Sequence, residues 1–217
     1  MTKSKFKLFA ALLLAAAMVA LSLSGAAPVL ADETAAILAN AAKSPAAHTA
    51  PEGYDQNDFN KVRTFLEQTD SNGIRNGEKL NPDGYDPNDP ESWGALFVDE
   101  WGFEYEAYFD WEEVDGINRM FAINLTYIKD FVGPFDMSGL DALSTLDIDG
   151  GNFGTADLSN CYEMTHCYFA NSTLNSVNFY NCANVTELYL QNNGLTEVLN
   201  LGDCTSLVFL DILMNND

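Results

Sequence analysis

The C-terminal half of the chain carries a repeat of apolar positions with a period of 21 to 22 residues. The inward positions of each copy lie at offsets of 3, 5, 10, 13, 15 and 18 from its first residue, and the third copy holds one inserted residue before Leu201. Offsets 3 and 5 flank a single outward residue, which is the alternation of a β-strand. A unit this short cannot bury its apolar edge alone, so the copies are predicted to stack into a solenoid. The predicted inward residues are Leu143, Leu146, Ile148, Phe153, Ala156, Leu158 and Cys161; Met164, Cys167, Phe169, Leu174, Val177, Phe179 and Cys182; Val185, Leu188, Leu190, Leu195, Val198, Leu201 and Cys204; and then Leu207, Leu210 and Ile212.

The third copy resembles the signature of the leucine-rich repeat family. It reads V-T-E-L-Y-L-Q-N-N-G-L from Val185, against L-x-x-L-x-L-x-x-N-x-L in the family. The signature asparagine falls on Asn193 and Asn215, whereas Gly151 and Ser172 stand in its place in two copies. In the family this asparagine bonds backbone groups inside the turn, so those two turns are expected to be less firmly held.

The resemblance implies a leucine-rich repeat solenoid of the right-handed β/α superhelix class. The inward cysteines 161, 182 and 204, each preceded by Asn or Asp, make the chain similar to the short repeats of extracellular bacterial proteins. About 21 residues per coil leave little room for a full helix, so short 3₁₀ or extended segments are expected on the outer side.

Four segments are predicted along the chain. Residues 1–31 hold three early lysines, an apolar run and a Val-Leu-Ala end, which is the pattern of a secretory signal peptide. Residues 32–53 are rich in Ala and Pro and are predicted to be a spacer. Residues 54–116 are expected to form an N-terminal cap, and residues 117–217 the leucine-rich repeats, with the final repeat incomplete.

The predicted cap consists of a helix followed by aromatic strands. Asp58 is expected to be the N-cap of the helix, and Asn72-Gly73 its end. A solenoid exposes its first core layer unless another element covers it, which is why a small helix-plus-strand unit is expected here. The apolar stripe of the helix is Phe59, Val62, Phe65 and Leu66.

The charge balance argues against several classes of function. Ten Lys and Arg residues face 32 Asp and Glu residues, for a formal net charge of −22. Nucleic-acid binding needs clustered Lys and Arg, and anionic lipid attracts basic segments. The sequence has no nucleophile elbow, HExxH motif or Gly-rich phosphate loop, so no enzyme activity and no cofactor are predicted. We expect a secreted or cell-surface protein with no membrane span in the mature chain.

One loop could hold a metal ion, and the buried cysteines could be free or paired. The loop residues Asp83, Asp86, Asn88 and Asp89 offer the oxygen ligands that Ca²⁺ takes, although they lack the EF-hand spacing and equally suit turns between prolines. The cysteines at 161, 182 and 204 share one inward position and are read as small buried apolar residues. A disulfide between adjacent coils stays an alternative. Apart from the Ca²⁺ interpretation, no metal is predicted.

The outward residues of the strands form the candidate binding surface. Stacked coils place them in columns on the concave face of the solenoid. Several are aromatic, and tyrosine is enriched in recognition patches, whereas a solvated sheet face with high strand propensity is the other interpretation. The candidate residues are Asp147, His166, Tyr168, Glu187, Tyr189, Gln191, Phe209 and Asp211.

Two functions remain at this point. The first is a recognition or adhesion protein that binds a protein or glycan partner through the concave face. The alternative is the N-terminal targeting fragment of a larger surface-associated enzyme, because the last repeat stops without a polar C-terminal cap.

Overall fold

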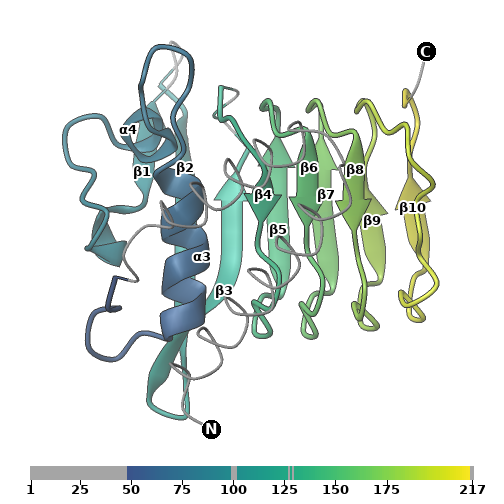
Figure 1. The fold of residues 1–217 in the computed structure, drawn as a ribbon, viewed down its shortest axis with the longest axis horizontal. Helices are drawn as coiled ribbons and strands as arrows, with labels where there is room; N and C mark the ends of the chain where they lie inside the picture. The colour runs from purple at the N-terminus through teal and green to yellow at the C-terminus, as the bar shows by residue number, and fades with distance from the viewer. Residues whose placement is uncertain (1–47, 99–101, 127, 129, 216–217) are drawn as a thin grey trace, which may run out of the picture. The chain divides into compact units, whose positions relative to one another are not determined.

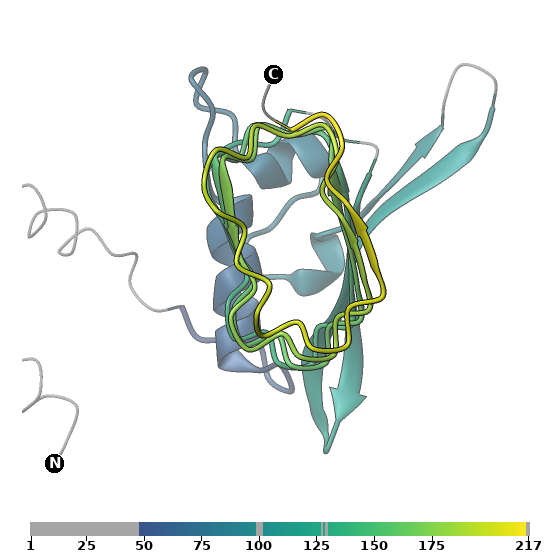
Figure 2. The same ribbon diagram turned by 90° about the vertical axis from the view of Figure 1, so that its right-hand side faces the viewer.

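A computed structural model of the chain describes residues 48–98, 102–126, 128 and 130–215. The predicted signal peptide and residues 32–47 of the predicted spacer lie outside this part. The described residues form a β-rich solenoid of about four turns with few helices (Figure 1). Seen along the solenoid axis, the successive turns superimpose on one another (Figure 2). The predicted solenoid architecture is therefore confirmed.

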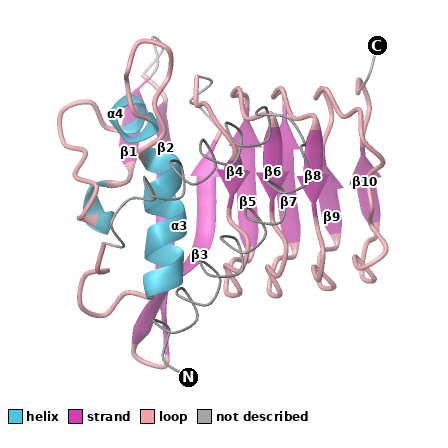
Figure 3. Cartoon of the chain, viewed as in Figure 1, coloured by secondary structure: helices cyan, strands magenta, loops and turns pink. Residues whose placement is uncertain are grey.

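The strands of the described residues fall into two sheets on opposite sides of the coil (Figure 3). In the larger sheet β1, β2 and β3 are antiparallel, and the strands that follow are parallel. The larger sheet runs β1 (Ala95–Val98), β2 (Glu104–Val114), β3 (Ile117–Leu125), β5 (Thr145–Asp149), β7 (His166–Ala170), β9 (Glu187–Tyr189) and β10 (Phe209–Asp211). The smaller, parallel sheet runs β4 (Phe135–Asp136), β6 (Thr155–Asp157) and β8 (Ser176–Asn178).

Among the described residues, three short helical elements precede the strands. They are α3 (Gln56–Leu66), α4 (Asn76–Leu80) and the 3₁₀ helix η1 (Pro90–Ser92). Figure 1 shows α3 beside β4, in the layer of the smaller sheet, while β2 and β3 lie in the layer of the larger sheet. None of the helices formed by the described residues has the length and apolar character needed to cross a bilayer.

The strand register reproduces the spacing of the repeats. Leu146 pairs with Cys167 and Cys167 with Leu188, each 21 residues on, and Leu188 pairs with Leu210 after 22. Ile123 of β3, which precedes the first full copy, pairs with Leu146 after 23 residues. The apolar period therefore fixes which residues lie side by side, because a slip of one residue would turn every inward side chain outward.

The inward residues of the first two full copies form the core. All but Val177, which is half-buried, are shielded from solvent, and Phe153 and Phe169 meet edge to face with ring centroids 5.1 Å apart. The prediction for Val198 is wrong: its side chain is 96% exposed, and Leu199 packs against the core instead. The inserted residue is thus accommodated before Leu199, which shifts the inward position by one.

Asn193 and Asn215 hold their turns through side-chain hydrogen bonds to the backbone. The Asn193 side-chain amide donates to the carbonyls of Phe169 (2.7 Å) and Leu190 (3.0 Å), and its oxygen accepts from the backbone N–H of Leu174 (3.3 Å). Asn215 repeats this pattern one coil later, donating to the Leu190 carbonyl at 2.8 Å. Each asparagine therefore ties one turn to the preceding coil.

The cysteines form a ladder of free thiols in the core. The Cys161 thiol donates to the Met137 carbonyl (3.3 Å), and the Cys182 thiol donates to the Leu158 carbonyl (3.1 Å). Each thiol thus satisfies a backbone acceptor of the coil before it. Burial raises the pKa of both thiols, to about 11 for Cys182. The reading as small buried residues agrees with this packing, and the structure pairs none of the four in a disulfide.

The start of the predicted helix needs a correction. Asp55 is the N-cap of α3, with its carboxylate accepting from the backbone N–H groups of Asn57 (2.8 Å) and Asp58 (3.1 Å). Asp58 lies in the first turn, fully buried, and accepts from Arg119 Nε (2.9 Å) and the N–H of Met120 (3.1 Å). The helix ends at Leu66, before the predicted Asn72-Gly73. Asp58 thus joins α3 to β3, a long-range contact that no local pattern encodes.

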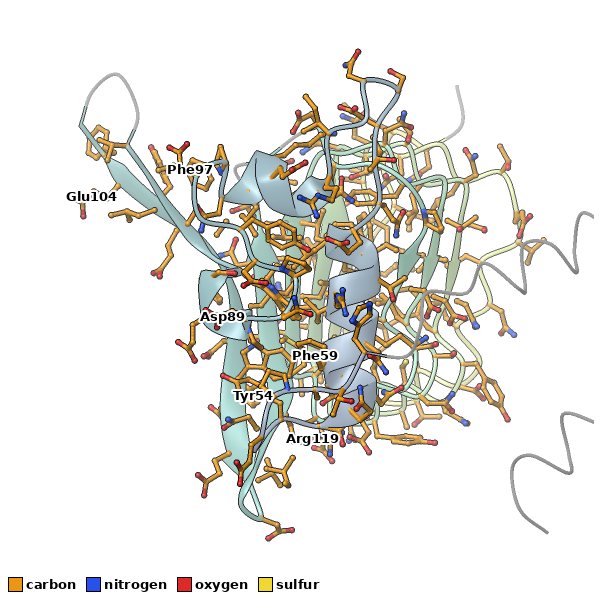
Figure 4. The ribbon with its side chains drawn as sticks, turned by 60° about the vertical axis from the view of Figure 1, so that its left-hand side comes forward. Tyr54, Phe59, Asp89, Phe97, Glu104 and Arg119 are labelled. Atoms are coloured by element: carbon orange, nitrogen blue, oxygen red, sulfur yellow. The ribbon has the colours of Figure 1, made fainter. Side chains whose placement is uncertain are left out.

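Aromatic side chains fill the space between α3 and the sheets. Phe65 packs edge to face on Phe135 of β4, with ring centroids 5.1 Å apart. Phe59 stacks on Trp93 at 5.2 Å, and Trp93 lies 6.2 Å from Trp111 of β2. Figure 4 shows Phe59 on α3, with Arg119 near the end of the same helix. The segment before the repeats and the repeats themselves therefore share one hydrophobic core.

Candidate functional site

The outward side chains of the larger sheet line up in rows across the strands, and we call this surface the sheet face. Its first row holds Thr145, His166, Glu187 and Phe209, which are register partners on β5, β7, β9 and β10. The second row holds Asp147, Tyr168, Tyr189 and Asp211 on the same strands. The structure therefore brings seven of the eight candidate residues together on neighbouring strands, while Gln191 lies just past the end of β9.

The centre of the sheet face is aromatic. The Tyr189 ring lies 5.9 Å from the ring of Tyr168, 4.8 Å from that of Phe209 and 5.5 Å from that of His166. Tyr168 and Tyr189 are half-buried, and Phe209 is 44% exposed. Parallel pairing explains the contact, because in-register strands hold equivalent side chains side by side. Aromatic rings at these distances attract one another and present one continuous apolar surface.

Carboxylates from three strands surround this aromatic centre. His166 lies between two of them, with Nε2 3.3 Å from Asp147 Oδ1 and Nδ1 3.4 Å from Glu187 Oε2. The Tyr189 hydroxyl donates to the same Glu187 oxygen at 3.2 Å. Glu187 is therefore oriented by two side chains, and its carboxylate stays about half exposed.

Burial and neighbouring charges shift the titration of this surface. Desolvation raises the pKa of Asp147, and the nearby His166 opposes that rise. The pKa of Tyr189 is raised by desolvation and by its hydrogen bond to Glu187, and the pKa of Tyr168 by desolvation and the nearby Asp149 and Asp147. Both tyrosines therefore keep their hydroxyl protons at neutral pH and can donate hydrogen bonds.

The sheet face extends beyond the residues that the repeats predict. Asp147 pairs with Asn124 of β3, and Asn124 pairs with Tyr108 of β2. Asn124 could have been found from the sequence, since it lies between Ile123 and Leu125 at the offsets of the repeat. Tyr108 could not, because β2 joins the sheet as an antiparallel strand outside the repeat.

In the loop considered for Ca²⁺, the carboxylates of Asp86 and Asp89 accept hydrogen bonds within the turns of the loop itself. The Asp86 carboxylate accepts from the backbone N–H of Asn88 (2.8 Å), and the Asp89 carboxylate accepts from that of Glu91 (3.2 Å) at the start of η1. The Asp86 carbonyl accepts from the indole N–H of Trp93 (2.8 Å). Within the described ranges, no three His, Cys, Asp or Glu side chains gather in a way that could hold a metal ion.

The sheet face is suited to binding through two kinds of contact. Its aromatic rings can stack on the apolar face of a sugar ring or pack against apolar side chains. Its carboxylates can accept hydrogen bonds from hydroxyl groups or pair with basic groups.

Comparison with known proteins finds no match to this chain among family models, curated proteins or solved structures. Any function assigned to the sheet face therefore rests on the chemistry of the surface itself.

Proposed function

We propose that this chain is an extracellular leucine-rich repeat protein that binds a protein or glycan partner through the sheet face. The observation that carries the proposal is the aromatic centre formed by Tyr168, Tyr189 and Phe209, which lies on an outward surface within a rim of carboxylates. If these aromatic residues were present only because they favour β-strands, there would be no need for carboxylates oriented around them. Large aromatic groups with polar neighbours are typical of recognition surfaces.

The leucine-rich repeat type is supported by the bonds of Asn193 and Asn215. Both side chains bond the turn of their own coil and the carbonyl of the coil before it. The N-terminal cap is supported by the burial of Phe59, Phe65 and Trp93 between α3 and the first strands. These side chains place apolar area against the first coil, which is the role that a cap fills in a solenoid.

Secretion or display at the cell surface completes the proposal and rests on the signal-peptide pattern of residues 1–31. An acidic surface suits a partner with basic groups beside its apolar or sugar surface, because opposite charges steer the two together. In the alternative function, targeting of a larger enzyme, the same face would contact the target. A catalytic activity encoded on the same polypeptide would separate that alternative from the first.

The test compares two tyrosine variants of the mature protein. Labelled protein is applied to a glycan array and to immobilised extracellular proteins, and affinities are measured for whatever binds. Tyr189→Ala should weaken binding by at least about 1 kcal/mol, or about fivefold. The matched control is Tyr180→Ala, which removes a tyrosine that is 58% exposed outside the sheets and should bind like the parent. If Tyr180→Ala abolishes binding and Tyr189→Ala does not, the assigned face is wrong.

A further inference from the structure

One edge of β2 lacks a neighbouring strand over most of its length. β1 pairs with β2 only from Glu104 to Ala107, and β3 pairs on the other side from Tyr108 to Val114. Beyond Ala107, the edge of β2 that faces away from β3 has no strand partner among the described residues. An open strand edge presents a row of unpaired backbone groups on which another strand can form.

A groove of about 500 Å³ lies along this open edge. We call it the β2-edge groove. Gly94, just before β1, lies against β2, where an added Cβ would be 3.2 Å from the Ala107 carbonyl oxygen, and Pro90 and Glu91 of η1 line the groove together with residues of β2. Figure 4 shows Asp89, at the start of η1, beside β2, while the β1–β2 hairpin with Phe97 and Glu104 projects away from the solenoid. The groove residues used below are Glu91, Trp93, Glu106, Tyr108, Asp110 and Trp111.

The groove is acidic and has aromatic walls. Glu91, Glu106 and Asp110 are exposed side chains that line it, and no basic side chain of the described residues does so. Glu91 is held in place by the Tyr54 hydroxyl, which donates to its Oε1 at 2.9 Å. Tyr54 also packs edge to face on Trp111 with ring centroids 5.0 Å apart. Tyr54 therefore holds Glu91 and Trp111 in place at the groove. The three carboxylates have no basic side chain beside them within the groove.

We propose that the β2-edge groove binds an extended, basic peptide segment of a partner protein, which adds to β2 as a further strand. Strand addition gives affinity through backbone hydrogen bonds, and alternate side chains of the added strand give specificity. Lysine or arginine side chains on one face of the segment would meet Glu91, Glu106 and Asp110. A second copy of this chain is a poorer fit, because its own β2 edge carries the same carboxylates and would repel them.

The probe is a capped synthetic peptide of alternating lysine and threonine, added to the mature protein at low salt. It should bind, its affinity should fall as salt is added, and the amides of β2 from Tyr108 onward should exchange more slowly with deuterium. The double variant Glu106→Gln/Asp110→Asn should bind at least about fivefold more weakly. The control variant Glu163→Gln, which removes an exposed carboxylate on a coil turn, should bind like the parent.

Two altered peptides separate strand addition from charge attraction. A peptide with glutamate in place of lysine should not bind. A peptide that keeps its lysines but is N-methylated at alternate residues should lose binding, because it cannot donate backbone hydrogen bonds to the edge. Equal binding of the N-methylated peptide, or equal weakening by Glu163→Gln, would overturn the proposal. So would dimerisation of the chain that masks the same edge amides.

This inference does not rest on the proposed function of the sheet face. Tyr189→Ala should leave binding of the lysine–threonine peptide unchanged, since three strands (β3, β5 and β7) separate β9, which carries Tyr189, from β2 in the sheet. Loss of peptide binding in that variant would mean that the peptide lies on the sheet face, and the groove assignment would then be wrong while the proposed function stood.

Discussion

The substitution Leu190→Ala tests the stacking of the coils. Leu190 is fully buried, between Phe169 of the preceding coil and Ile212 of the next in the repeat register. Alanine lacks three of its carbons, which removes about 2.4 kcal/mol of transfer free energy at about 0.8 kcal/mol each. The cavity left behind adds about 24 cal/mol for each Å³ that does not collapse. Ile212 is 47% exposed and can move inward, so the expected loss of stability is about 2–3 kcal/mol.

Urea unfolding followed by two signals measures this loss. Far-UV circular dichroism reports the whole chain, whereas tryptophan fluorescence reports the segment before the repeats, which holds all three tryptophans. Because coils couple mainly to their neighbours, the dichroism midpoint should fall more than the fluorescence midpoint.

The matched control is Val198→Ala, at a position that the sequence pattern places inward and the structure places in solvent. It should change stability by no more than about 0.5 kcal/mol. Equal midpoints for Leu190→Ala and the parent, or equal losses for both variants, would refute the packing described here.

Three further changes test other features of the chain. Asp58→Ala should lower the free energy of unfolding by about 3 kcal/mol in urea titrations, since it leaves Arg119 without its buried carboxylate; an unchanged midpoint would contradict this. Cys182, with its pKa raised to about 11, should resist alkylation at pH 8 until the protein unfolds, as mass spectrometry can show; rapid labelling of the native protein would count against the buried ladder. The pKa of Asp147 is raised above 3.8, so the folded state binds more protons than the unfolded state as pH rises from that value. In urea unfolding at a series of pH values, the parent should therefore lose stability relative to Asp147→Asn as pH rises from 3.8 through the raised pKa. The same pH dependence of the unfolding free energy in both proteins would argue against the shift.

The sequence alone determined the solenoid and the pairing of its strands. A 21-residue coil must bury one apolar edge against its neighbour, so the repeat spacing decides that Cys167 lies between Leu146 and Leu188. The same alternation placed Tyr168 beside Tyr189 on the outward surface. These features could be predicted because each follows from a local pattern repeated at a constant interval.

Only the tertiary structure decided the features that depend on contacts outside the repeat. The position of one inserted residue turned Val198 outward and Leu199 inward, a choice that the apolar pattern left open. Asp58 became the buried partner of Arg119 because helix and strand meet there, although its sequence context suits an N-cap equally well. The open edge of β2 likewise arises where an antiparallel hairpin joins a parallel sheet, and such long-range pairing leaves no periodic signal in the sequence.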